Sequence, residues 1–189
     1  MDMNINFDYN SPVILTYLFL SLIACILNAI TRGKTNTLLF SSYRSSIWNP
    51  FTYIRLFTHA IGHKDFDHFV HNFLFILLVG PMIEEKYGSI PLLVMFLITS
   101  FIIAIFNLIF DDYKIMGASG NVYMLIVLSS FSNIRDGKIP LTLILILVFY
   151  VIGEMKKSLL EGNKKVYHDG HLIGAICGLL FGFYLFFGI

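Results

Sequence analysis

Two long stretches without a charged side chain constrain the fold of this chain most strongly. Tyr9–Thr31 and Tyr87–Phe110 contain no Asp, Glu, Lys or Arg. Each is close to the roughly 20 residues that an α-helix needs to cross the hydrocarbon core of a bilayer. Of the 189 residues, 57% are hydrophobic and only 13% are charged, whereas about 25% are charged in an average soluble domain. The sequence therefore predicts an all-α protein that crosses the membrane several times.

The charge balance and the cysteines narrow the class further. The chain has 13 Lys and Arg against 12 Asp and Glu, a formal net charge of +1. A nucleic-acid-binding surface needs a basic excess to neutralise phosphates, so we expect no nucleic-acid partner. Cys25 and Cys177 lie in apolar runs, where cysteine packs as a small hydrophobic residue, and no disulfide is expected. Residues 1–10 lack Lys and Arg, unlike a cleavable signal peptide, so the first apolar run is expected to remain as a helix.

Charge-free runs bounded by turn residues predict six membrane helices in one domain that covers residues 1–189. Pro91 and Pro140 fall in the first turn of two of them, where a missing N–H costs nothing. The longest connection, Thr31–Asp67, has aromatic residues around Arg44 and Arg55, a mixture typical of a membrane surface. The predicted helices cover residues 12–30, 68–83, 89–110, 119–133, 139–153 and 170–189.

Polar side chains at membrane depth are costly and are therefore candidates for function. Four of the six histidines lie close together, at positions 59, 63, 68 and 71. His68 and Asn72 are four residues apart on the second predicted helix and share one face. The segment Lys114–Ser119 contains a glycine turn. Because irregular backbone at membrane depth must be covered by protein or by a water-filled cavity, we expect this segment to dip into the bundle.

The sixth predicted helix carries a stripe that begins at His171 and continues through glycines at positions 174, 178 and 182. Glycines at this spacing let two helices approach closely. The natural partner is the fourth helix, which begins at Ser119 and includes Tyr123. That packing would bring a serine hydroxyl near an imidazole, the minimal pair for nucleophilic catalysis. We expect Ser119, His171, His68, His71 and Asn72 to line one aqueous pocket.

These motifs resemble those of the rhomboid family of intramembrane serine proteases. The residues Gly-Ala-Ser-Gly at 117–120 resemble the family's G-x-S-G nucleophile motif, and Tyr123 stands where the family has a tyrosine. His63, His68 and Asn72 reproduce the family's H-x4-H-x3-N spacing. His171 with its glycines resembles the catalytic-histidine helix. With the two elements described next, five motifs stand in the expected order and form a strong combined signal.

Two further elements of the resemblance lie outside the reacting groups. Ile54-Arg55 resembles the family's Trp-Arg element, and Glu84 with Gly88 resembles the Glu and Gly that close the second helix. Ile54 departs from the usual tryptophan, and Asn121 stands where a small apolar residue is ordinary. Neither departure removes a catalytic group. We expect Glu84 and Arg55 to tie the first connection to a helix.

The resemblance implies a six-helix rhomboid-like bundle with an interfacial first loop and a Ser-His dyad. Ser119 would be the nucleophile and His171 the general base and then the acid, with Tyr123 stacked on its ring. His68, Asn72 and the Ser119 N–H would form the oxyanion hole. The substrates would be transmembrane-helix proteins within the lipid bilayer, hydrolysed in or near the membrane. No metal and no organic cofactor follow from the resemblance.

Two other function classes remain open. A relative without activity could bind membrane helices, although such relatives usually lack the serine or the histidine. The histidine pairs His59/His63 and His68/His71 could instead hold a metal or haem. That alternative leaves the glycine turn unexplained, and no H-E-x-x-H motif is present. We expect His59 and His63 to be structural.

Two features of the sequence predict opposite orientations in the membrane. The first, third and fifth predicted connections share one side and hold ten of the 13 Lys and Arg residues. The positive-inside rule would place that side, with the mouth of the site, in the cytoplasm. The resemblance implies a multi-pass protein of the cell membrane with its mouth outside. We expect the second arrangement, because long interfacial connections dilute the charge rule.

Overall fold

The computed structural model gives the bounds of seven helices, and further described residues between 141 and 153 are also helical. The described part of the chain comprises residues 8–110, 113–131, 141–142, 144–146, 148–149, 152–153 and 168–187. The helices are α1 (Pro12–Ile30), α2 (Lys34–Leu39), α3 (Pro50–Thr58), α4 (Phe66–Tyr87), α5 (Ser89–Phe110), α6 (Ser119–Phe131) and α8 (His168–Phe187).

Helices occupy most of the described residues in the predicted spans. Helices α1 and α5 have the predicted bounds, while α4 is longer than the predicted 68–83. It begins earlier because the Asp65 side chain accepts a hydrogen bond from the His68 N–H, at 2.8 Å. It continues to Gly88, whose φ of +90° ends the helix. The described residues of the predicted 139–153 helix are helical. Residues 132–133, 139–140, 143, 147, 150–151 and 188–189 of the predicted spans lie outside the described part.

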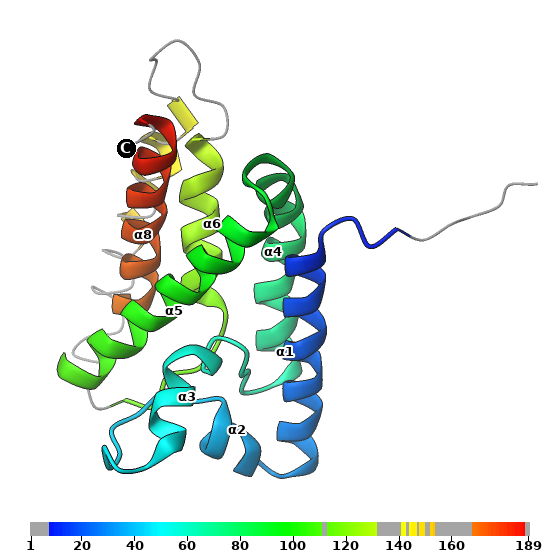
Figure 1. The fold of residues 1–189 in the computed structure, drawn as a ribbon, viewed down its shortest axis with the longest axis vertical. Coiled ribbons are helices and arrows are strands. Elements are labelled where there is room, and N and C mark those ends of the chain that lie inside the picture. The colour runs from blue at the N-terminus through cyan, green and yellow to red at the C-terminus, as the bar shows by residue number, and fades with distance from the viewer. Residues whose placement is uncertain are drawn as a thin grey trace, which may run out of the picture.

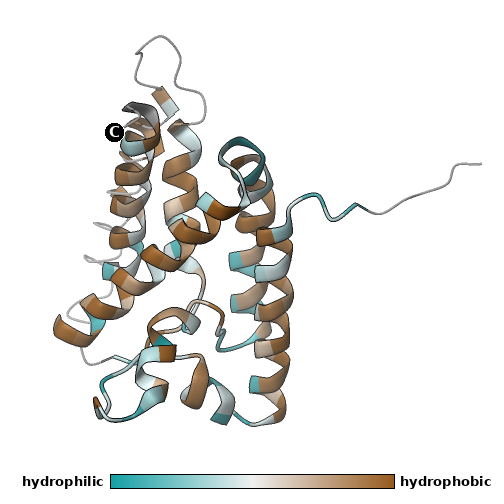
Figure 2. Cartoon of the chain, in the orientation of Figure 1, coloured by the Kyte–Doolittle hydropathy of each residue, from teal (hydrophilic) through white to brown (hydrophobic). Residues whose placement is uncertain are grey.

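The helices have the composition of membrane spans. Within the described residues, α1, α4 and α5 are long and apolar enough to cross a bilayer, and α6 and α8 are shorter apolar helices. Figure 2 shows hydrophobic residues along most of these helices, with hydrophilic residues around α2 and α3, at the end of α4 and in the segment before α1. Large apolar side chains such as Ile30 and Leu78 are 72% exposed. The chain is therefore an integral membrane protein.

The longer helices form two pairs with one helix between them. Helices α6 and α8 run side by side, α1 lies beside α4, and α5 crosses between these pairs (Figure 1). The predicted glycine stripe is confirmed as the contact between α8 and α6. A Cβ added at Gly174 would lie 2.9 Å from the carbonyl carbon of Gly120, and one at Gly178 would lie 2.5 Å from the Met124 oxygen.

The connection between α1 and α4 contains α2 and α3 and is held by a buried arginine. Trp48 is 88% exposed, as expected for an interfacial loop. Arg55 is not the surface cation that its aromatic neighbours suggest, because it is only 1% exposed. Its guanidinium donates to the Ser45 hydroxyl at 2.5 Å and lies 4.2 Å from the centre of the Tyr43 ring. Arg55 thus ties α3 to the chain before it.

Glu84 joins α4 to the first turn of α1. Its carboxylate oxygens accept hydrogen bonds from the backbone N–H groups of Val13 at 2.9 Å and Ile14 at 3.1 Å. These are N–H groups that a helix cannot satisfy internally. The Ser89 hydroxyl donates to the same carboxylate at 2.7 Å. The predicted structural role of Glu84 therefore corresponds to capping α1.

Candidate active site

The turn before α6 places Ser119 inside the bundle. Ile115 pairs with Ser42 through two backbone hydrogen bonds of 2.9 Å. The Gly117 N–H then donates to the carbonyl oxygen of His59, also at 2.9 Å. Gly117 has a φ of +124°, a conformation that glycine adopts without steric cost. The expectation that this segment dips into the bundle is confirmed, and Ser119 is the first residue of α6.

Ser119 and His171 line the same cavity. The cavity has a volume of about 310 Å³ and lies between α5, the first turns of α6 and α8, and the turns that precede α4 and α6. Its apolar lining residues include Ile103, Phe106, Ile115, Met116 and Ile173. Its polar lining residues include His59, Ser100, Asn107, Ser119, Asn121 and His171. The glycine contact between α6 and α8 is what brings the serine and the histidine to one space.

The imidazole of His171 is covered on one face by Tyr123. The two ring centroids are 4.4 Å apart and the planes are 26° from parallel. The stack holds the imidazole at a defined angle, and it is the contact that the family resemblance implies for these two residues. Asp169, two residues before His171, also lines the cavity.

His68 and Asn72 reach the turn before Ser119 from α4. A Cβ added at Gly117 would lie 2.7 Å from Cε1 and 2.9 Å from Nε2 of His68, and 3.7 Å from Nδ2 of Asn72. Only glycine leaves room for these two side chains. Nδ1 of His68 and Nδ2 of Asn72 are buried and have no hydrogen-bond partner within the described part of the chain. The unpartnered amide nitrogen of Asn72 therefore lies beside the turn that precedes Ser119.

The prediction of one pocket lined by five polar residues is wrong in part. The cavity is lined by Ser119 and His171 but not by His68, Asn72 or His71. His68 and Asn72 approach the turn through Gly117 instead. His71 is exposed on α4, and its Nδ1 lies 2.7 Å from the Asp67 carbonyl oxygen. A shared helix face places side chains in one direction, but the tertiary packing decides which space they enter.

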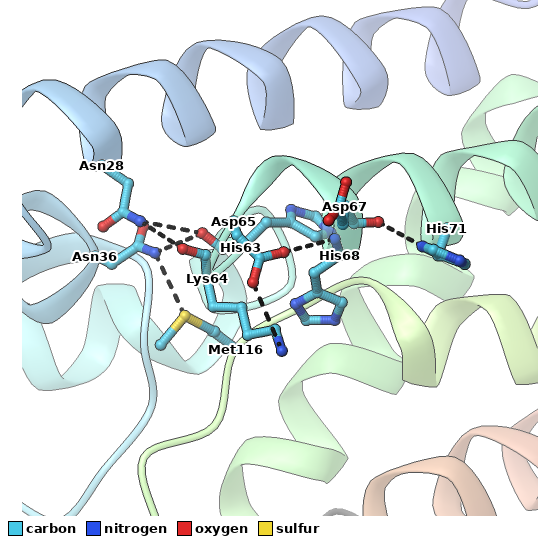
Figure 3. A network of polar contacts seen from close by, with 9 residues as sticks. All are labelled: Asn28, Asn36, His63, Lys64, Asp65, Asp67, His68, His71 and Met116. Carbon is cyan, nitrogen blue, oxygen red and sulfur yellow. Dashed lines mark hydrogen bonds and ion pairs between the residues drawn. The ribbon is translucent and has the colours of Figure 1, made fainter.

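A polar network holds two segments in place, the one before α4 and the one before Gly117 (Figure 3). The side-chain amides of Asn28 in α1 and Asn36 in α2 both donate to the His63 carbonyl oxygen, at 3.3 and 2.8 Å. The Asn36 amide also lies 3.3 Å from the sulfur of Met116. The segment before α4 is thereby fastened to α1 and α2, and the approach to Gly117 to α2.

His59 and His63 have the surroundings of structural histidines. Nδ1 of His59 lies 3.2 Å from the Arg55 carbonyl oxygen, and Nδ1 of His63 lies 3.0 Å from that of Ile61. Burial lowers the pKa of each imidazole to about 4. Both rings are therefore neutral near pH 7.

No arrangement of three or more His, Cys, Asp or Glu side chains suited to hold a metal ion is found among the described residues. Within the two histidine pairs at helical spacing, His59 lines the cavity and His63 does not, while His68 is half-buried and His71 is exposed.

Several polar residues near the site are not singled out by charge-free runs. Tyr17, Ser100 and Asn107 are each buried within a helix that the sequence defines by its lack of charge. Their signal is polarity at membrane depth. Asn36, in the first loop, gives no sequence signal of its buried contacts.

The motifs and the fold agree with the comparisons to known proteins. A family model for the Rhomboid domain matches residues 50–187. The chain therefore belongs to the rhomboid family of membrane proteins. It is 30% identical over 119 residues to the rhomboid protease GluP of Bacillus subtilis (strain 168). The matched region is 60% of this chain and 24% of that relative, so the chain spans much less than the length of GluP.

Proposed function

We propose that this chain is an intramembrane serine endopeptidase that hydrolyses peptide bonds in or near the transmembrane helices of membrane proteins. Its family and its similarity to a rhomboid protease support the general class. The observation that carries the proposal is the shared cavity of Ser119 and His171, with Tyr123 stacked on the imidazole.

In the proposed reaction, the Ser119 hydroxyl attacks the carbonyl carbon of the scissile bond and His171 takes the hydroxyl proton. His171 then gives that proton to the leaving amine, and water hydrolyses the acyl-enzyme. The negative oxygen of the tetrahedral intermediate would be met by His68, Asn72 and the Ser119 N–H. Ser119 begins α6, and the free N–H groups and positive dipole end of a helix N-terminus favour an anion.

The proposed substrate class follows from this geometry and from the family. The chain to be cut must be extended to enter a space between packed helices. Membrane helices with glycine, proline or other helix-weakening residues near one end meet this need at least cost. We expect cleavage beside a small side chain.

The test is intact-mass measurement of the detergent-purified protein after reaction with a fluorophosphonate. Wild type should gain one adduct, and Ser119→Ala and His171→Ala should gain none while keeping the helical circular-dichroism spectrum of wild type. An adduct that persists in Ser119→Ala would contradict the assignment of the nucleophile. A well-folded wild type that never reacts, in detergent or in liposomes, would favour the alternative of a non-catalytic helix-binding protein.

We further propose that the α2–α3 end of the bundle faces outward from the cell membrane. Lys34, the first residue of α2, and Glu85, near the C-terminal end of α4, lie at opposite ends of the bundle and are both exposed. The native cysteines, Cys25 and Cys177, are buried. A membrane-impermeant thiol reagent on intact cells should label Lys34→Cys and leave Glu85→Cys unlabelled until the cells are permeabilised. The reverse pattern would support the charge rule.

A further inference from the structure

A buried polar link joins three helices next to the proposed nucleophile. The side-chain amide nitrogen of Asn121 in α6 donates to the Tyr17 hydroxyl of α1 at 3.2 Å and to the Ser100 hydroxyl of α5 at 3.3 Å. The Tyr17 hydroxyl in turn donates to the Ala60 carbonyl oxygen at 2.9 Å. Asn121 is 2% exposed and Ser100 is 3% exposed. Hydrogen bonds in such an apolar setting are costly to break because no water replaces them.

This link and the glycine turn fasten Ser119 from both sides to one short segment. Two residues before Ser119, the Gly117 N–H donates directly to the His59 carbonyl oxygen. Two residues after it, Asn121 reaches the neighbouring Ala60 through the Tyr17 hydroxyl. The first turn of α6 therefore cannot rotate or slide without breaking one of the two attachments.

Tyr17 is itself held in place by aromatic packing. Its ring centroid lies 5.2 Å from those of Phe73 in α4 and Phe96 in α5. The hydroxyl is thus fixed relative to three helices. Loss of the hydroxyl alone leaves this packing intact, which separates the hydrogen bonds from the fold.

We propose that Tyr17 and Asn121 are positioning residues that set the location of the Ser119 hydroxyl relative to His171. The proposal rests on the proposed serine-protease function. It gives α1, which lies outside the matched residues 50–187, a part in the reaction. It also gives a role to Asn121, the polar residue at a position where a small apolar residue is ordinary.

The experiment measures the rate constant of fluorophosphonate adduct formation at saturating reagent, its half-saturating concentration, and the thermal unfolding midpoint. The variants are Tyr17→Phe, Asn121→Leu and the double variant. Tyr9→Phe is the matched control, because Tyr9 is 51% exposed and its hydroxyl contacts only Thr16 among the described residues. We expect each single variant to lower the saturating rate by about 10- to 100-fold, the scale for misplacing a reacting group by an ångström or less. The half-saturating concentration should stay unchanged.

The double variant separates positioning from a general loss of packing. Because both substitutions break the same link, the double variant should react no more slowly than the slower single variant. A double variant that falls by the product of the two single effects would overturn the proposal, as would a Tyr17→Phe protein that reacts at the wild-type rate. If Asn121→Leu does not fold, Tyr17→Phe alone decides in the same way.

A second readout keeps this test distinct from the proposed function. If wild type itself fails to react, the serine-protease assignment fails first. Hydrogen exchange of the 117–121 amides then decides whether the link positions this turn. Tyr17→Phe should speed exchange there and leave the amides of α4 unchanged. Equal exchange in Tyr17→Phe and wild type would refute the positioning role independently of any activity.

Discussion

The contact between α8 and α6 predicts a large effect from one added methyl group. Gly174 lies three residues after His171 on α8, against Gly120, which follows Ser119 on α6. In Gly174→Ala, the new Cβ would lie 2.9 Å from the carbonyl carbon and 3.1 Å from the Cα of Gly120. Carbon atoms pack at about 3.5 to 4.0 Å. The two helices must therefore separate by at least about 0.6 Å, because the obstacle is backbone and not a side chain that can rotate.

Two costs follow from that separation. Overpacking a close contact destabilises a protein by about 1 to 3 kcal/mol. The same movement carries His171 away from Ser119, and a displacement of about 1 Å at a reacting group can cost roughly 100-fold in rate. We expect Gly174→Ala to lower the rate of fluorophosphonate adduct formation by about 10- to 100-fold and to lower the unfolding midpoint.

The assay compares the adduct rate and the unfolding midpoint with those of Gly153→Ala. Gly153 is also helical, but an added Cβ there meets no atom of the described residues within 4 Å. That control should keep the wild-type rate and midpoint. A Gly174→Ala protein that reacts and unfolds like wild type would refute the reasoning that the glycine contact sets the distance between the two groups.

Three other predictions concern the turn, a helix cap and pH. Gly117→Ala should abolish adduct formation and lower the unfolding free energy by about 1 to 3 kcal/mol. The reason is that a φ of +124° strains alanine and that the new Cβ would meet the His68 ring. A folded variant with wild-type kinetics would contradict this. Glu84→Ala should lower the unfolding free energy by about 2 to 4 kcal/mol in detergent titrations, since two N–H groups of α1 lose their acceptor, and a change below 1 kcal/mol would count against the cap. Burial lowers the pKa of His59 and His63 to about 4, so the unfolded chain binds protons first as the pH falls below about 6.5. The unfolding free energy should therefore fall between about pH 6.5 and pH 4, by roughly 2 kcal/mol per histidine at about pH 5. Equal unfolding free energies at about pH 7.5 and pH 5 would contradict the neutral state of these rings.

Much of the helical framework could be predicted because its causes are local. Absence of charge over about 20 residues specifies α1 and α5, and the spacing of glycines along α8 identifies the face that meets α6. Charge alone was misleading at the end of α4, where Glu84 lies inside the helix and is 4% exposed. A charged residue ends a lipid-facing run, but it continues a helix when its carboxylate has donors to bind.

The sequence also predicted one part of the candidate site and missed another. The sequence could predict that Ser119, His171 and Tyr123 lie close together, because each lies at helical spacing from a glycine contact or a turn. The position of His68 and Asn72 could not be predicted, because helical spacing says which residues share a face but not which space that face enters. The structure directs them to Gly117 and leaves them outside the cavity lining.

The sequence by itself determined the membrane class, most helix bounds and the candidate nucleophile and base, since these follow from composition and from periodicity along one helix. Only the tertiary structure decided that Arg55 is buried, that Tyr17 reaches Asn121 across 104 positions, and that His68 and Asn72 lie outside the lining of the cavity. The physical reason is that a hydrogen bond between distant residues depends on the relative rotation and depth of whole helices. Those two quantities are set by packing between helices, and no single stretch of sequence contains them.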